Sequence, residues 1–139
     1  MGEGSRDPSL VEGNKVINPE SLEQIETQVA RTPGPAFAVD LHGEVVAWNG
    51  RAEVMFGTPA SEAVGRPCAM VVRGTDRTGQ VLCRAGCPWL PIAESAVRTD
   101  IPMVVRRGPR PAARVEVVMR HRMLRDRLGR PVAVLHMAK

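Results

Sequence analysis

Apolar residues alternate with a period of two in five short segments, and this pattern constrains the fold more than any other feature of the sequence. Such alternation is typical of β-strands that bury one face. Two of the segments flank a turn at Asp40–Gly43, and the other three follow one another at the end of the chain, separated by turns that contain glycine and proline. The five segments are 36–39, 44–48, 103–107, 114–124 and 132–137. Because strands and helices are segregated along the chain, we predict an α+β fold with an antiparallel sheet.

Helical spacing of apolar residues marks the segments before and between these strands. Asn18 is predicted to cap an amphipathic helix that begins at Pro19. Further helices are predicted at 50–56, 58–64 and 88–98. The intervening segment 66–87 has weak periodicity, and long irregular segments in compact domains often carry function.

The size of the chain and the lack of a long apolar run limit the class of protein. A chain of 139 residues has the usual length of one domain. We divide it into a flexible N-terminal segment (1–17), an N-terminal helix (18–32) and a single domain (33–139). The sequence has no apolar run of the roughly 18 residues that a membrane span needs, and its polar N-terminus lacks the apolar core of a secretory signal. We therefore expect a cytoplasmic protein with no membrane segment and with reduced cysteines.

The net charge of +4 is distributed unevenly along the chain. Residues 1–66 carry five basic and ten acidic side chains, whereas residues 98–130 carry ten arginines against three acids. Such a dipole can attract an acidic protein surface, a second copy of the chain or a nucleic acid. Only 3% of residues are aromatic, which leaves little for stacking bases, so we favour the interpretation that the arginines lie on the solvated face of the sheet.

Three motifs follow one another in a fixed order: Pro35–Glu53, which contains Asp40, a glycine turn and Trp48-Asn49, then Met55-Phe56-Gly57, then Ser61–Arg66. Together they resemble the PAS (Per-ARNT-Sim) family of sensor domains. The resemblance covers residues 33–137 and implies a five-stranded antiparallel PAS-type sheet with short helices over one face, preceded by the amphipathic helix. It also implies a non-enzymatic domain that senses a small molecule, redox state, light or oxygen. Relatives commonly dimerise through the sheet and an N-terminal helix.

Local backbone chemistry explains these motif residues without a ligand. Asp40 and Asn49 can accept hydrogen bonds from amides that a tight hairpin and a helix start leave unpaired. Gly43, Gly57 and Gly65 stand where a positive φ is easiest for glycine. The motif residues therefore identify a scaffold, and the ligand has to be inferred from other residues.

The sequence argues against the two best-known PAS cofactors. Haem-binding relatives usually ligate iron with a histidine on the helix before the last three strands, but 88–98 contains no histidine, and His42, His121 and His136 are predicted in a turn and in strands. Light-sensing flavin relatives carry a cysteine at a position similar to that of Cys68. The asparagines and glutamine that bind the flavin in those relatives have no counterparts here, because the last three strands contain neither residue type.

The three cysteines are the residues that we select as the candidate sensing site. Cys68 opens the segment 66–87, and Cys83 and Cys87 close it next to a predicted helix N-terminus, where a thiolate is favoured. A subgroup of bacterial PAS regulators looks similar, with Gly-Arg-x-Cys followed by Cys-x-x-x-Cys-Pro. Several states remain open: a zinc site or iron–sulfur cluster with a fourth ligand, reversible thiol oxidation, a Cys83–Cys87 disulfide, or inert buried cysteines. Met70 and Trp89 are the candidates to line the pocket, with plain core packing as their alternative.

The sequence therefore predicts a sensory PAS domain that responds to a small ligand, redox state or metal through a cysteine-containing pocket. We expect its output to pass through a homodimer or a regulatory partner such as a kinase or transcription factor. The alternatives are a ligand-free interaction or dimerisation module and, from the arginines of 98–130, a nucleic-acid-binding domain. No phosphate-binding loop or nucleophile motif supports an enzyme. The identity of the ligand, and whether the chain is a part of a larger regulator, are open at this stage.

Overall fold

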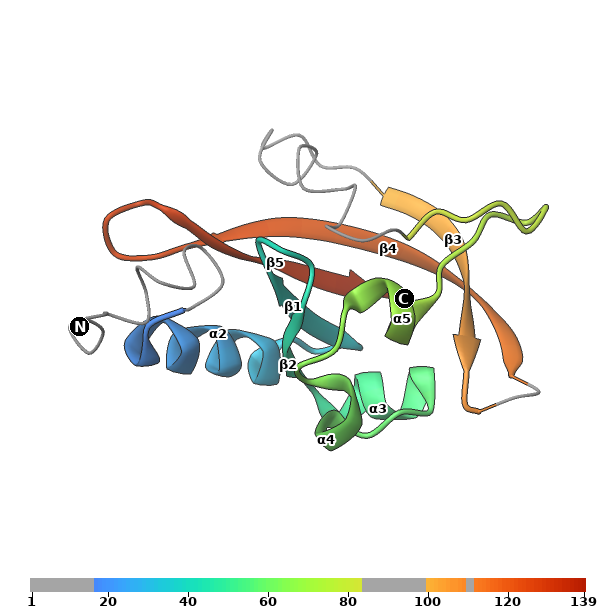
Figure 1. Cartoon of the computed structure of the whole chain (residues 1–139), viewed down its shortest axis with the longest axis horizontal. Helices are drawn as coiled ribbons and strands as arrows, with labels where there is room; N and C mark the ends of the chain where they lie inside the picture. Colours follow the sequence, from blue (N-terminus) through green and yellow to red (C-terminus); the bar gives the residue numbers. More distant parts are fainter. Residues whose placement is uncertain (1–16, 84–99, 110–111) are drawn as a thin grey trace, which may run out of the picture.

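The chain folds around one five-stranded antiparallel sheet with the strand order β2-β1-β5-β4-β3 (Figure 1), which confirms the predicted fold class. The structure, a computed structural model, describes residues 17–83, 100–109 and 112–139. The described helices are α2 (Pro19–Arg31), α3 (Gly50–Phe56), α4 (Ala60–Ala63) and α5 (Cys68–Val72). The strands are β1 (Ala36–Asp40), β2 (Val45–Trp48), β3 (Asp100–Arg107), β4 (Ala113–Arg125) and β5 (Pro131–Ala138).

Each face of the sheet is buried by a different set of helices. On one face Phe37, Val39, Val105 and other inward residues pack against α3, α4 and α5 and form the larger core. On the other face α2 lies along the sheet and buries Ile25 and Val29 against small side chains of β1 and β5. Alternation along each strand produces this division, since successive side chains point to opposite faces.

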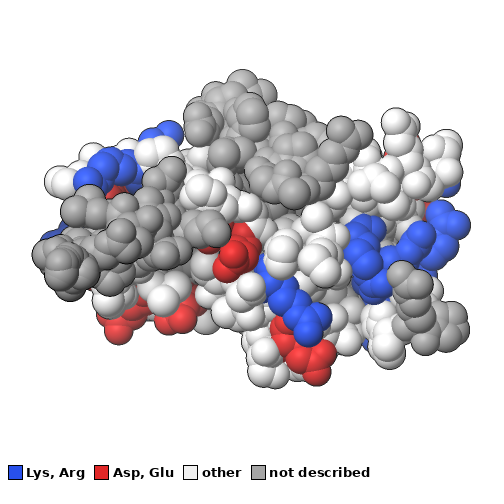
Figure 2. All heavy atoms as spheres, viewed as in Figure 1, with Lys and Arg blue, Asp and Glu red and all other residues white. Residues whose placement is uncertain are grey.

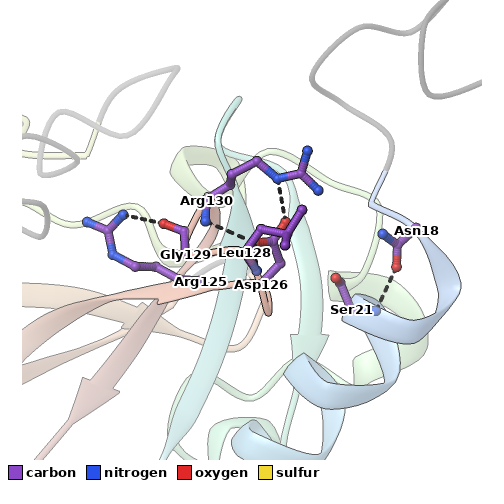
Figure 3. A network of polar contacts seen from close by, with 7 residues as sticks. All are labelled: Asn18, Ser21, Arg125, Asp126, Leu128, Gly129 and Arg130. Atoms are coloured by element: carbon purple, nitrogen blue, oxygen red, sulfur yellow. Dashed lines mark hydrogen bonds and ion pairs between the residues drawn. The ribbon is translucent and has the colours of Figure 1, made fainter.

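Capping and turn residues begin and end these elements at the predicted places. Figure 3 shows Asn18, whose side chain accepts a 2.9 Å hydrogen bond from the backbone N–H of Ser21 at the start of α2. In the β4–β5 turn, Asp126 Oδ1 accepts from the N–H groups of Leu128 and Arg130 at 2.9 Å each. These bonds satisfy backbone donors that a helix start and a tight turn would otherwise leave without partners.

Gly57 ends α3 because no other residue fits that position. Its φ is 65°, and a Cβ there would lie 2.7 Å from the backbone nitrogen of Gly108. The N–H of Gly108 in turn donates to Phe56 O at 2.9 Å. This close approach joins the helical layer to the end of β3.

Residues 66–83, the described part of the segment 66–87, are more ordered than their weak periodicity predicts. They contain α5, whose Cys68, Val71 and Val72 are buried against the sheet, and a helix of five residues is too short to produce a periodic signal. After α5 the chain turns back on itself, with Thr75 bridged to Val81. The predicted helix at 88–98 lies outside the described residues.

Candidate functional site

The structure describes three of the five residues selected as site candidates. Cys68 is buried in the larger core, and Cys83 is half-buried at its margin. Met70 lies on the opposite side of α5 from the buried residues, with its side chain 68% exposed, and its role in lining a pocket stays a prediction. Cys87 and Trp89 lie outside the described residues, and their roles stay predictions.

Residues 73–83 form a hairpin that extends the sheet beyond its edge strand, and we call this segment the edge hairpin. The backbone of Thr75 exchanges two hydrogen bonds with Val104 of β3, at 2.8 and 2.7 Å. The N–H groups of Leu82 and Cys83 both donate to the carbonyl of Gly74, at 2.9 and 3.1 Å. The two arms of the hairpin are therefore tied to each other and to β3, which brings Cys83 next to a strand 20 residues further along the chain.

Sulfur atoms from the hairpin and from β3 pack against Gly74. A Cβ built on Gly74 would lie 2.7 Å from Cys83 Sγ and 2.9 Å from Met103 Sδ, closer than any real side chain allows. Met103 is only 4% exposed and belongs to the larger core. The thiol of Cys83 is thus placed at the boundary between the core and the surface, where its sulfur and that of Met103 lie close together.

A groove of about 380 Å³ runs beside this contact, and we call it the edge groove. Two guanidinium side chains line it: Arg73 from the hairpin and Arg106 from β3. Arg73 donates to the carbonyl of Gly108 at 3.2 Å. The complete lining is Ala69, Arg73, Gly74, Thr75, Val81, Cys83, Arg106 and Ala112. The groove is therefore cationic and contains a thiol.

Two histidines lie together on the face of the sheet that the short helices cover. His121 of β4 and His136 of β5 are direct cross-strand neighbours, with ring centroids 4.5 Å apart. His136 is 3% exposed and stacks on Phe37, also at 4.5 Å. Burial lowers the pKa of His121 to about 4, and burial together with the charge of His121 lowers the pKa of His136 well below its usual value. Both imidazoles are therefore neutral at physiological pH.

Sequence analysis placed these histidines in strands but did not identify them as a buried pair. The sequence does indicate that His121 is buried, because this residue continues the alternation of Val117 and Met119, which point into the core from β4. Their pairing depends on the register of β4 against β5, which a single sequence does not specify.

The described residues give limited support to a bound cofactor. Among residues 17–83, 100–109 and 112–139, no group of three or more His, Cys, Asp or Glu side chains could hold a metal ion. Because Cys87 lies outside these ranges, the predicted zinc or iron–sulfur site is not tested by this finding. For a flavin ring, the described inner face of β4 and β5 offers two imidazoles and apolar side chains, but no asparagine or glutamine side chain.

Comparison with known proteins identifies the family of the chain. The model of the PAS fold family matches residues 23–139, while a search of curated proteins found no match. The chain is similar to the Rhodobacter sphaeroides LOV protein (TM-score 0.62, 15% identity, 88% of this chain and 68% of that chain covered). It is also similar to the PAS domain of Bordetella pertussis BvgS (TM-score 0.55, 15% identity, 85% and 83% covered). A third similar structure is the photo-excited blue-light photoreceptor Vivid (TM-score 0.60, 14% identity, 89% and 99% covered).

These identities are low enough that the similar structures establish the fold and no more. Within the described part of the chain, no helix has the length and apolar character needed to cross a bilayer. The strand order, the helices over one face and the family match over most of the sequence agree with one another. The chain belongs to the PAS family, whose members are generally sensory modules that commonly dimerise or contact a partner.

Proposed function

We propose that this PAS domain is a non-enzymatic redox sensor in which the oxidation state of Cys83 sets the position of the edge hairpin against β3. One observation carries the proposal: Cys83 Sγ and Met103 Sδ both lie within 3 Å of the place that a Cβ on Gly74 would take. The sulfur of Cys83 lies where the edge hairpin meets the buried Met103 of the core, so a chemical change at the thiol affects both the hairpin and the core.

The chemistry at Cys83 requires a thiolate and a peroxide. The thiolate sulfur attacks one peroxide oxygen, an S–O bond forms as the O–O bond breaks, and the leaving hydroxide takes a proton to become water. Arg73 and Arg106 line the same groove, and positive charge favours the thiolate form that reacts. Cys68 is only 7% exposed, so we expect it to react more slowly.

The product needs space that the contact does not offer. A sulfenic acid adds one oxygen to a sulfur that packs against Gly74, so the added oxygen either turns into the edge groove or pushes the hairpin away from β3, and we propose the second. The two Thr75–Val104 hydrogen bonds hold the hairpin to β3, and we expect them to break when the hairpin moves. Their loss would expose the N–H and C=O groups of an edge strand, which can pair with a second copy or a partner chain. This is the route that we propose for output to a dimer, a kinase or a transcription factor.

Oxidation with one equivalent of hydrogen peroxide is expected to modify Cys83 before Cys68 and to loosen the edge hairpin. Hydrogen exchange at the amides of Thr75 and Val104 should become about tenfold faster, as expected for the loss of one or two backbone hydrogen bonds. Mass spectrometry of a trapped sulfenic acid identifies the modified residue, and exchange is measured on the same samples. Cys83→Ser should remove both effects, whereas Cys68→Ser, the matched control, should retain them. Unchanged exchange in a protein with oxidised Cys83 would refute the proposal.

A second measurement separates thiol chemistry from a bound cofactor. Protein purified without oxygen should contain neither zinc nor iron and should be colourless if Cys83 acts as a thiol. Zinc or iron in proportion to the chain would support the predicted site at Cys68, Cys83 and Cys87 instead. A flavin spectrum would favour the chemistry of the blue-light receptors that share the fold.

A further inference from the structure

Two polar groups in the edge groove are buried without a hydrogen-bond partner. They are Nη1 of Arg106 and Oγ1 of Thr75, and neither has a partner among the described residues. Both side chains line the groove of about 380 Å³. A buried donor with no partner costs stability, so its presence in a folded protein calls for an explanation such as an absent ligand.

Among the described residues, the arginines around the groove also have no acidic partner. Arg106 lies directly opposite Arg114 in the β3–β4 register, an unfavourable pairing of like charges. Within the described ranges, no ion pair involves Arg73, Arg106, Arg107 or Arg114. Figure 2 shows basic side chains gathered on the side of the molecule where the end of the β3–β4 hairpin lies.

Elsewhere along β3, β4 and the edge hairpin, arginines have acidic partners. Arg120 forms a two-pronged contact with Asp100, with its Nε and Nη2 at 2.8 and 3.1 Å from the two carboxylate oxygens. Arg77 of the hairpin pairs with Glu116 of β4 at 3.0 Å. Carboxylates therefore neutralise arginines along part of this surface, whereas the arginines beside the edge groove have no carboxylate partner in the described part of the chain.

We propose that the edge groove binds a small oxyanion, a molecule that carries a carboxylate or phosphate group. Arg106 would donate the principal charge-assisted hydrogen bond after a small rotation of its guanidinium group, and the Thr75 hydroxyl would donate a second. Arg73, which also lines the groove, contributes positive charge while it keeps its bond to the Gly108 carbonyl. The volume lies at the lower end of the range for small-molecule pockets, which favours a metabolite-sized anion over a larger ligand. This site goes beyond the thiol proposal and does not require Cys83 to react.

The stability of variants at Arg106 and Thr75 distinguishes a binding role of these residues from a structural one. If Arg106 and Thr75 held the fold together, their removal would destabilise the protein. Because Nη1 of Arg106 and the hydroxyl of Thr75 are buried without a partner, replacing Arg106 with methionine or Thr75 with the isosteric valine should leave the ligand-free protein as stable as before or more stable. The backbone bonds of Thr75 to Val104 do not involve the hydroxyl and remain in the valine variant.

Isothermal titration at low ionic strength with inorganic phosphate and, separately, with succinate tests this site. The wild-type chain should bind at least one probe more tightly than it binds chloride at matched ionic strength. Arg106→Met should weaken that binding about tenfold or more, and Thr75→Val by a smaller factor, as expected for lost charge-assisted and neutral hydrogen bonds. Arg122→Met is the matched control, since it removes the same charge from an exposed position of β4 and should not change binding.

The arms of the experiment separate the possible outcomes. Preference for phosphate or for succinate identifies which oxyanion class the groove takes. No binding of either probe, or an equal loss in Arg122→Met, would overturn the proposal, and so would a marked loss of stability in both Arg106→Met and Thr75→Val. Peroxide should still modify Cys83 in Thr75→Val, because the Thr75 hydroxyl takes no part in the thiol reaction. Anion binding can therefore succeed or fail independently of the redox response of Cys83.

Discussion

Replacing Asn49 with alanine is expected to lower the free energy of unfolding by about 3 to 4 kcal/mol, because its side chain makes four hydrogen bonds that each contribute about 1 kcal/mol. Its Oδ1 accepts from the backbone N–H groups of Ala36 and Ala52, at 3.1 and 2.9 Å. Its Nδ2 donates to the carbonyls of Val29 and Gly34, at 3.2 and 3.0 Å. One amide thus connects the end of α2, the linker, β1 and the start of α3. Urea unfolding followed by circular dichroism measures the loss.

Asn18 provides the matched control for this substitution. It is also an asparagine at a helix N-cap, but its side chain makes a single hydrogen bond, to the N–H of Ser21. Asn18→Ala should therefore cost about 1 kcal/mol, the usual value for a lost cap. If the two alanine variants lost equal stability, Asn49 would act only as a cap, and its bonds to Val29 and Gly34 would contribute nothing measurable.

The comparison of these two asparagines shows which parts of the fold sequence patterns can predict. The cap at Asn49, the αL glycine at Gly57 and the alternation of the strands are local signals, and the structure confirms each of them. The bonds from Asn49 to Val29 and Gly34 are not local, because they depend on how α2 packs against the sheet. A family motif marks such a residue, but its physical importance becomes visible only in three dimensions.

The candidate site was harder to predict, for the same reason. Cysteine spacing indicated the right segment, and Cys68 and Cys83 do contact the core. The edge groove, however, joins Thr75 to Arg106 through the Thr75–Val104 bridge, and no periodicity predicts an isolated bridge. The exposed position of Met70 could not be predicted because the periodicity does not reveal α5, so the side of that helix facing the sheet could not be assigned.

Lowering the pH from 6.5 to 4 is expected to destabilise the domain through the His121–His136 pair. The folded state lowers both pKa values, with that of His121 falling from 6.5 to about 4, so the unfolded chain binds more protons within this window. The contribution is fully present above pH 6.5 and is lost as the pH falls toward 4. For His121 alone, the loss amounts to about 3 kcal/mol at pH 4. Urea unfolding at a series of pH values measures it.

Substituting the histidines distinguishes their contribution to the pH dependence of stability from that of the carboxylates, which also titrate in acid. Asp76 and Asp126 have lowered pKa values because they accept hydrogen bonds in their turns, so their contributions are lost only as the pH falls below about 3.8. Between pH 6.5 and 4, His121→Gln should therefore flatten the dependence of stability on pH, and the double variant with His136→Gln should flatten it further. His42→Gln, in the β1–β2 turn, should retain the wild-type slope. A wild-type protein equally stable at both ends of this window would show that the pair does not remain neutral inside the fold, because a protonated imidazole there would need a compensating charge.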